Sequence, residues 1–493
     1  MWNVFFIILA VSAVSSPELA SEYSDFLASG GASASGLASS TLSVTWDAPF
    51  QSGGGYCSEA TAFLLGLSAL PNVDVRVRQH GDSYNPDYLR GLPPADAALL
   101  ARALTSGAER WHHPDVSVCH SEPGAWHLPP THPARYHSGA LPCPNPAARV
   151  RVGRTMFESD RLPAGWAERC NAMDEIWVPT AFAAKVFAAG GVEMSKLRIV
   201  PEAVDAMGAF NPQAAAAPPA SDTVTDTTTT SLLPPRTANI TRFLFVGKFE
   251  RRKGLDILLA AFATAFGRGG GGGAGGAPAQ LWVLTSAYHS SSDFEAEVAS
   301  VFKSLACDSL KSESGRQGGR HLCLPHDLAT SPPPIYLLSG VPQSSLPSVY
   351  ASVDALVQPS RGEGWGRPHV EAMAMGLPVI ATHWSGPSAY LDETVGYPLA
   401  HTGLSEIKDG PFAGHLMADP DAFMLVDALK AIVRDRDVAR EKGTRARRKM
   451  IEMYSPRDVG AFVAVQMRRL VERARAKKLH HRISRGDSDT ESL

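Results

Sequence analysis

The chain has 493 residues, which is long enough for two or three ordinary domains. Hydrophobic residues make up 44% of the sequence and charged residues 19%, so most of the chain can bury a core. The formal net charge of -3 argues against a chain built mainly to hold nucleic acid, because such chains usually carry a strong basic excess. We therefore expect no nucleic-acid partner.

The cysteines are sparse and contain no C-x-x-C pair. We interpret them as buried small residues or free thiols rather than as a metal cluster. One or two disulfides remain an alternative if the chain is secreted. The residues are Cys57, Cys119, Cys143, Cys170, Cys307 and Cys323.

The N-terminus contains an apolar stretch, Val4–Val14, followed by small residues. This stretch has the length of a signal-peptide core and is too short to span a bilayer. It lacks a preceding Lys or Arg. We expect residues 1–16 to be a signal peptide and the protein to enter the secretory pathway. The alternative is an apolar start to a poorly ordered leader in a cytoplasmic protein.

The first half of the chain alternates strand and helix patterns. Residues 17–40 are rich in Ser, Gly and Ala and predict a flexible leader. After it, a strand runs into a Gly-rich loop and a helical apolar pattern, and further strands follow. This alternation predicts an open parallel α/β sheet for a first domain over residues 41–210. The strand-bearing segments are 42–48, 73–81, 114–124, 175–192 and 197–205.

The second half repeats the pattern after a break. Residues 211–240 are Ala/Pro/Thr low complexity and predict an interdomain linker. A second α/β domain is expected over residues 241–455, interrupted by disordered insertions at 267–280 and 312–334. Residues 456–478 predict a long helix that packs back toward the first domain, and 479–493 a polar tail. The strand-bearing segments are 242–266, 280–288, 333–340, 353–360 and 377–384.

The stretch "PSRGEGWGRPHVEAMAMGLPVIAT", residues 359–382, holds two glutamates across a Gly-rich turn and a helix start. Glu363 is placed in the loop after a buried strand, and Glu371 near the first turn of the helix that Pro368 favours. A helix N-terminus can hold a phosphate, and a carboxylate can accept two hydrogen bonds from a vicinal diol. The alternative for each glutamate alone is an ordinary surface or first-turn acid.

This stretch strongly resembles the E-x7-E signature of retaining GT-B glycosyltransferases of family 4, also called group 1, in a plant- or algal-like subgroup. The resemblance implies two Rossmann-like domains that face each other across a cleft. It also implies that Glu363 lies near the donor sugar and that Glu371 binds the nucleotide ribose. Gly364, Trp365 and Gly366 would belong to the donor site.

Other segments carry the same resemblance. "FVGKFERRKG" implies that Lys248 and Lys253 neutralise the donor diphosphate. Lys248 stands where the family usually has Arg, so bidentate phosphate contact is lost there and Arg251 or Arg252 would compensate. The loop "PFQSGGGYCSEA" implies that Gly54 and Gly55 lie near the phosphates or the acceptor.

Two further residues are candidates for the cleft of the first domain. Related enzymes often have a histidine there that bonds the donor sugar, and His120 in "VCHSEPG" is the corresponding candidate. The alternative is a packed histidine. Asp47, at the end of the first strand, is a weaker candidate for the acceptor side.

The resulting expectation is a retaining, metal-independent glycosyltransferase without a cofactor. Its partners would be a UDP- or GDP-sugar donor and a carbohydrate, lipid or protein acceptor. The basic end of the last helix suggests weak contact with a membrane surface, with a solvated helix end as the alternative. Two other functions stay open: a nucleotide-sugar 2-epimerase and a non-catalytic nucleotide-sugar-binding protein.

Overall fold

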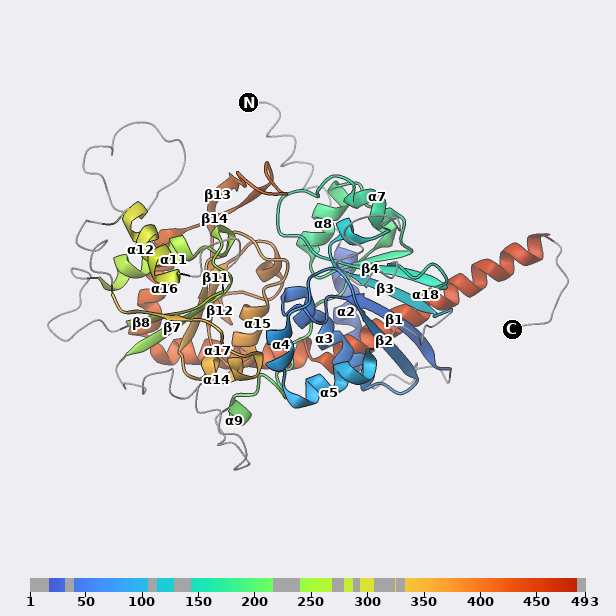
Figure 1. Cartoon of the computed structure of the whole chain (residues 1–493), viewed down its shortest axis with the longest axis horizontal. Helices are drawn as coiled ribbons and strands as arrows, with labels where there is room; N and C mark the ends of the chain where they lie inside the picture. The colour runs from blue at the N-terminus through green and yellow to red at the C-terminus, as the bar shows by residue number, and fades with distance from the viewer. Residues whose placement is uncertain are drawn as a thin grey trace. The chain divides into compact units, whose positions relative to one another are not determined.

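The computed structural model describes residues 17–31, 40–104, 113–127, 143–215, 240–267, 279–286, 293–305, 324 and 333–485. Outside these ranges lie the predicted signal peptide, most of the predicted linker, most of both insertions and the last eight residues of the tail, 486–493. Figure 1 shows the chain with its helices and strands labelled.

The chain forms two compact units. Unit 1 comprises residues 1–156, 162–203 and 454–493, and unit 2 comprises 157–161 and 204–453. Two details differ from the ranges expected from the sequence. The five-residue segment Phe157–Arg161 and residues 204–210 belong to unit 2, although we had given both to the first domain.

Unit 1 contains a parallel sheet of six strands in the order β2-β1-β3-β4-β5-β6 (Figure 1). Val, Ile and Leu from these strands form the core with helices on the sheet faces. The sequence analysis did not identify β4. The strands are β1 Leu42–Ala48, β2 Val73–Gln79, β3 Val116–His120, β4 Val150–Arg154, β5 Glu175–Val178 and β6 Leu197–Ile199.

The helices of unit 1 include two elements that correct the sequence analysis. The predicted flexible leader contains a helix, because Tyr23 and Phe26 pack their rings against Phe462. The predicted tail is helical as far as Arg485. The helices are α2 Pro17–Ala28, α3 Gly55–Ser68, α4 Pro86–Arg90, α5 Pro94–Ala103, α7 Trp166–Asn171, α8 Ala181–Ala189 and α18 Pro456–Arg485.

Unit 2 contains a second parallel sheet of six strands, in the order β12-β11-β10-β7-β8-β9. An antiparallel pair, β13 and β14, follows the sheet in the chain and was not predicted. The strands are β7 Thr241–Val246, β8 Ala279–Leu284, β9 Ile335–Leu338, β10 Ala355–Gln358, β11 Val379–Thr382, β12 Gly396–Leu399, β13 His401–Glu406 and β14 Leu416–Pro420.

The helices of unit 2 complete its core. The most apolar, α11, is buried along most of its length between the sheet and α16. The helices are α9 Pro212–Ala215, α11 Leu255–Phe266, α12 Phe294–Leu305, α14 Leu346–Ala351, α15 Arg367–Ala374, α16 Ala422–Arg434 and α17 Arg436–Met453. Among the residues that the structure describes, no helix is both long and apolar enough to cross a membrane.

Candidate active site

The carboxyl ends of β7 and β10 lie side by side where the strand order of the unit 2 sheet reverses. β7 is the first strand of this sheet in the chain and β10 the fourth, and the two are neighbours. Open α/β sheets bind their ligands outside the carboxyl ends of the strands at such a switch point. The connection after β7 carries Lys253, and the connection after β10 carries Glu363.

Gly254 allows these two connections to touch. Its φ is +73°, and a Cβ atom on it would lie 1.9 Å from the carbonyl oxygen of Pro359. Arg361 fastens the contact from the other side. Its backbone N–H donates to the carbonyl of Arg252 at 2.7 Å, and its guanidinium binds both carboxylate oxygens of Asp256 at 2.9 and 2.8 Å.

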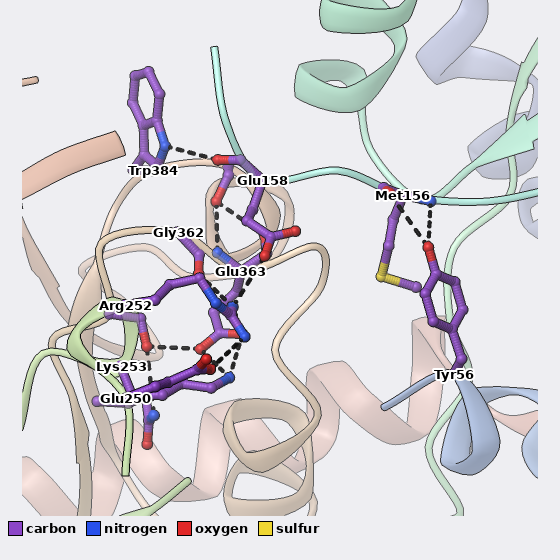
Figure 2. Close-up of polar contacts among 12 residues, drawn as sticks. Tyr56, Met156, Glu158, Glu250, Arg252, Lys253, Gly362, Glu363 and Trp384 are labelled. Carbon is purple, nitrogen blue, oxygen red and sulfur yellow. Dashed lines mark hydrogen bonds and ion pairs between the residues drawn. The ribbon is translucent and has the colours of Figure 1, made fainter. Parts of the chain in front are cut away.

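Glu363 is held through its side chain and its backbone (Figure 2). The Lys253 ammonium is 2.8 Å from both carboxylate oxygens, and the Ser360 hydroxyl donates to Oε1 at 2.7 Å. The Ser385 hydroxyl accepts from the Glu363 backbone N–H at 3.0 Å and donates to its carbonyl at 2.9 Å. Glu363 is only 5% exposed, so these contacts take the place of water.

The neighbouring cations keep Glu363 ionised. Burial alone would raise the pKa of this carboxyl, but Lys253 and Arg252 together lower the pKa to about 2. Burial and the Arg252 charge lower the pKa of the Lys253 ammonium, and Glu363 opposes that shift. The two groups therefore form a buried, charged pair at neutral pH.

Arg252 contacts three carboxylates. Its Nη1 lies 3.2 Å from Glu363 Oε2 and 3.2 Å from Glu158 Oε1, and its Nη2 donates to Glu250 Oε1 at 2.8 Å. Nη1 also donates to the carbonyl of Gly362 at 2.9 Å. Figure 2 shows this guanidinium between the three acids. It is thus neutralised by protein carboxylates and does not provide the compensating phosphate contact that we expected from the sequence.

Glu371 lies one turn into α15 and is 4% exposed. The Tyr350 hydroxyl donates to its Oε2 at 3.0 Å, and Arg367 Nε lies 3.7 Å from Oε1. Burial raises the pKa of Glu371, and Arg367 and Tyr350 oppose that shift. The sequence analysis missed Tyr350, which comes from a different helix, α14, and has no local motif.

The turn between the two glutamates is shaped by its glycine and its aromatic residue. Gly366 has φ +105°, and a Cβ atom on it would lie 2.5 Å from His369 Nδ1. Trp365 is 2% exposed, and its ring packs against Tyr390, which also donates to the Trp365 carbonyl at 2.7 Å. The Trp365 side chain therefore supports the loop from inside, whereas Gly364 is half-buried.

The structure places His120 in a buried polar cluster of unit 1. The side chain is 0% exposed, and both ring nitrogens are bonded: Nδ1 accepts from Trp46 Nε1 at 3.1 Å, and Nε2 lies 2.8 Å from Glu59. Arg154 forms a hydrogen bond with the other oxygen of Glu59 at 2.6 Å. The interpretation of His120 as an open ligand contact is wrong here, because burial and these two bonds leave the ring no exposed nitrogen.

Asp47 is likewise occupied. It is 1% exposed and pairs with the guanidinium of Arg78 through both oxygens. The expectation that it approaches an acceptor is therefore not supported. Three other predicted site residues keep their status as predictions. Gly54 and Gly55 form the start of α3, and Lys248 is exposed after β7.

Cys119 and Cys143 form a disulfide, so one pairing left open by the sequence is settled. Cys57 and Cys170 are free and buried, and Cys307 and Cys323 lie outside the described residues. Within the described ranges, one group of potential metal ligands occurs, formed by Asp47 and the two disulfide cysteines.

Residues 333–449 match the family model described as glycosyl transferases group 1. They form a glycosyltransferase domain. The match covers α15 and both signature glutamates, but not Lys253. No curated protein matches the chain.

Three solved structures share the fold. HepE from Anabaena in complex with UDP and glucose has 11% identity and a TM-score of 0.54, covering 86% of this chain and 99% of its own. Sucrose-phosphate synthase from Thermosynechococcus elongatus has 16% identity and a TM-score of 0.53, covering 88% and 100%. A glycosyltransferase from Rickettsia africae has 12% identity and a TM-score of 0.52, covering 87% and 99%.

These likenesses confirm the GT-B architecture expected from the sequence, with two sheets of parallel strands. The family match and the fold together support a glycosyltransferase enzyme.

Proposed function

We propose that the protein is a retaining glycosyltransferase that moves a sugar from a nucleoside-diphosphate sugar to an acceptor hydroxyl. One observation carries the proposal. A buried Lys–Glu pair, with Lys253 Nζ 2.8 Å from both oxygens of Glu363, lies at the switch point of the unit 2 sheet. Beside it begins α15, whose N-terminal N–H groups can bind an anion.

Departure of the nucleoside diphosphate builds negative charge, which fixed cations can stabilise. An ammonium has three N–H donors, and Glu363 takes two from Lys253, which leaves one for a phosphate oxygen. Lys248 and the α15 N-terminus add positive potential from the same edge of the sheet. Because these groups can balance the leaving charge, we propose transfer without an obligatory metal ion or cofactor.

The two glutamates have separate roles in this proposal. Glu363 accepts hydrogen bonds from hydroxyls of the donor sugar, and Lys253 and Ser360 fix its orientation. Glu371 holds the ribose diol, with its Oε2 oriented by Tyr350. The acceptor hydroxyl attacks from the face that the diphosphate leaves, and the leaving phosphate takes its proton. The anomeric configuration is thereby retained, and we assign no protein nucleophile.

UDP-sugars are the first donors to test, because the HepE structure holds UDP and glucose. Purified protein comprising residues 17–493, which keeps α2, is mixed with UDP-, GDP- and ADP-sugars in EDTA, with and without candidate acceptors. Released nucleotide is measured. Release from one donor that Glu363→Ala and Lys253→Ala both abolish would support metal-independent transfer. A recovered donor sugar with inverted configuration at C2 would instead indicate the epimerase.

No release from any donor leads to calorimetric titration with UDP, GDP and ADP. Absence of binding to all three would contradict the glycosyltransferase proposal, and binding without release from the matching nucleotide's sugars would favour the non-catalytic alternative. For an active enzyme, NMR of the first product formed determines the anomer, and an inverted product would contradict retention.

A further inference from the structure

A five-residue segment of the chain belongs to a different unit from the residues on either side of it. The chain leaves unit 1 after Met156, contributes Phe157–Arg161 to unit 2, and returns to unit 1 at Leu162. We call Phe157–Arg161 the crossing segment. Its second residue, Glu158, contacts Arg252 beside the proposed donor site.

The crossing segment is fixed to unit 2 at several independent points. Asp160 pairs with Leu416 on β14, with N···O distances of 3.1 Å from its backbone N–H and 2.6 Å to its side chain. The Ser159 hydroxyl lies 2.9 Å from His415 Nδ1. Phe157 packs its ring edge-on against His415, with centroids 5.7 Å apart. Glu158 is therefore held in place by its neighbours in the chain.

Glu158 itself contacts the loop that carries Glu363. Trp384 Nε1 donates to its carbonyl at 3.3 Å (Figure 2). A Cβ atom on Gly362 would lie 2.9 Å from the same carbonyl and 3.2 Å from Glu158 Cβ, so only glycine permits this approach. The side chain of Glu158 then reaches Arg252 at 3.2 Å.

A continuous chain of contacts thus runs from Glu158 through Arg252 to Glu363. Arg252 Nη1 is shared between the two glutamates, at 3.2 Å from each, and also bonds the Gly362 carbonyl at 2.9 Å. A guanidinium is planar and rigid, so an acid on one edge fixes what the rest of it can reach. Without Glu158, Arg252 has one acid fewer and is free to turn toward Glu363 or Glu250.

We infer that Glu158 is a positioning residue of the donor site, which holds Arg252 so that Glu363 and its loop keep the geometry needed for sugar transfer. The inference rests on the proposed function. Glu158 is not expected to touch the donor, and Arg252 is expected to act on Glu363 and not on phosphate. Glu158→Ala should therefore lower kcat and leave nucleotide affinity nearly unchanged.

The test compares donor turnover and nucleotide affinity in four variants. A misplaced catalytic group typically costs on the order of 100-fold in rate, so we expect Glu158→Ala to lower kcat about 10- to 100-fold. The Kd of the free nucleotide, from calorimetry, should change less than about 3-fold. Glu158→Gln keeps an acceptor for Arg252 and should recover part of kcat. Arg161→Ala, an exposed residue of the same segment, is the matched control and should behave as wild type.

A double-mutant cycle tests the route through Arg252. If Glu158 acts through Arg252, Glu158→Ala should have little further effect on kcat in an Arg252→Ala background. Full additivity of the two losses would overturn this route. Unchanged kcat in Glu158→Ala, with an active wild type, would overturn the inference alone. A wild type with no turnover and no nucleotide binding would overturn the proposed function and this inference with it.

Discussion

At the scale of single residues, Lys253 is the cation on which the candidate site depends most. It is the group that bonds both oxygens of Glu363 and still has a donor left for a phosphate. Arg252, its neighbour in the sequence, is equally basic but is neutralised by three carboxylates. Adjacent cations in "ERRKG" thus have different roles, and the sequence does not distinguish them.

Lys253→Met should lower nucleotide release from the donor by about 100- to 1,000-fold, the usual effect of removing one preorganised electrostatic stabiliser. The variant also leaves Glu363 without its closest cation, so some loss of stability should accompany the loss of rate. Lys303→Met, an exposed lysine on α12, controls for loss of a charge. Release within about 3-fold of wild type would show that the diphosphate is stabilised elsewhere.

Tyr350→Phe removes one hydroxyl that donates to Glu371 at 3.0 Å. A hydrogen bond to a charged group contributes about 1.5–3 kcal/mol, so the Kd of the nucleotide should rise roughly 10-fold or more. Because Glu371 is proposed to bind the ribose and not the reacting sugar, kcat at saturating donor should change little. A fall in kcat with an unchanged Kd would contradict that division between the two glutamates.

His120 predicts a pH dependence of stability. Burial lowers its pKa from 6.5, although the ionised Glu59 opposes the shift. The unfolded chain then binds more protons than the folded protein below that pH, so the free energy of unfolding falls as pH falls, by at most about 1.4 kcal/mol per pH unit. The difference in melting temperature between wild type and His120→Gln should therefore shrink from pH 7.5 to about pH 5.5. A constant difference would mean that folded His120 is protonated.

At the scale of elements, the chain uses glycine where two elements approach closely. α3 and α18 pack in unit 1 through Gly66 and Gly460. A Cβ atom on Gly66 would lie 2.0 Å from the carbonyl oxygen of Pro456 and 3.2 Å from the Cα of Gly460. The helices can pack at this distance only if neither position carries a side chain.

Gly66→Ala should destabilise the protein by about 1–3 kcal/mol, because the extra methyl group forces the two helices apart. The matched control is Gly55→Ala in the same helix, where an added Cβ atom would meet nothing within 4 Å. Chemical denaturation measures both variants. Equal stability of the two would show that α3 and α18 shift without cost.

The element scale also explains which parts of the fold were predictable. Strands such as β1 and β10 were found from the sequence because a buried strand is a local apolar run. The leader helix α2 was missed, since its two aromatic residues acquire a partner only when Phe462 arrives from α18. The pair β13 and β14 was missed as well: β13 is mostly exposed and lacks an apolar pattern.

At the scale of the whole molecule, the chain passes between its two units more than once. Unit 1 is completed by residues 454–493 after unit 2 has been formed in sequence. Helix α18 supplies part of the unit 1 core, including Phe462, Val463 and Met467. The proposed donor site, by contrast, is built from residues of unit 2.

Calorimetry should therefore resolve separate responses of the two units. Phe462→Ala, at a 2% exposed position, should cost unit 1 about 3–5 kcal/mol and lower its transition. A bound nucleotide at about 100 times its Kd should stabilise unit 2 by roughly 2.7 kcal/mol and raise the other transition. Ser304→Ala, on the exposed side of α12, is the control. A nucleotide that raised the transition lowered by Phe462→Ala would place its site in unit 1.

The sequence by itself determined the alternating α/β pattern and the placement of Glu363, Lys253 and Glu371 at the ends and starts of elements. Periodicity, turn residues and motif spacing are local properties, and they survive without knowledge of the fold. The tertiary structure decided which groups meet. Arg252 and Glu363 are 111 residues apart in the chain, and His120 and Glu59 are 61 apart.

Such contacts depend on strand order and on the close packing of loops, which no local pattern encodes. Strand order placed the connections after β7 and β10 side by side, and Gly254 let them touch. Packing buried His120 between Trp46 and Glu59, and it brought Glu158 from the crossing segment to Arg252. The charges of these side chains are written in the sequence, but their partners, and hence their roles, follow from the folded chain.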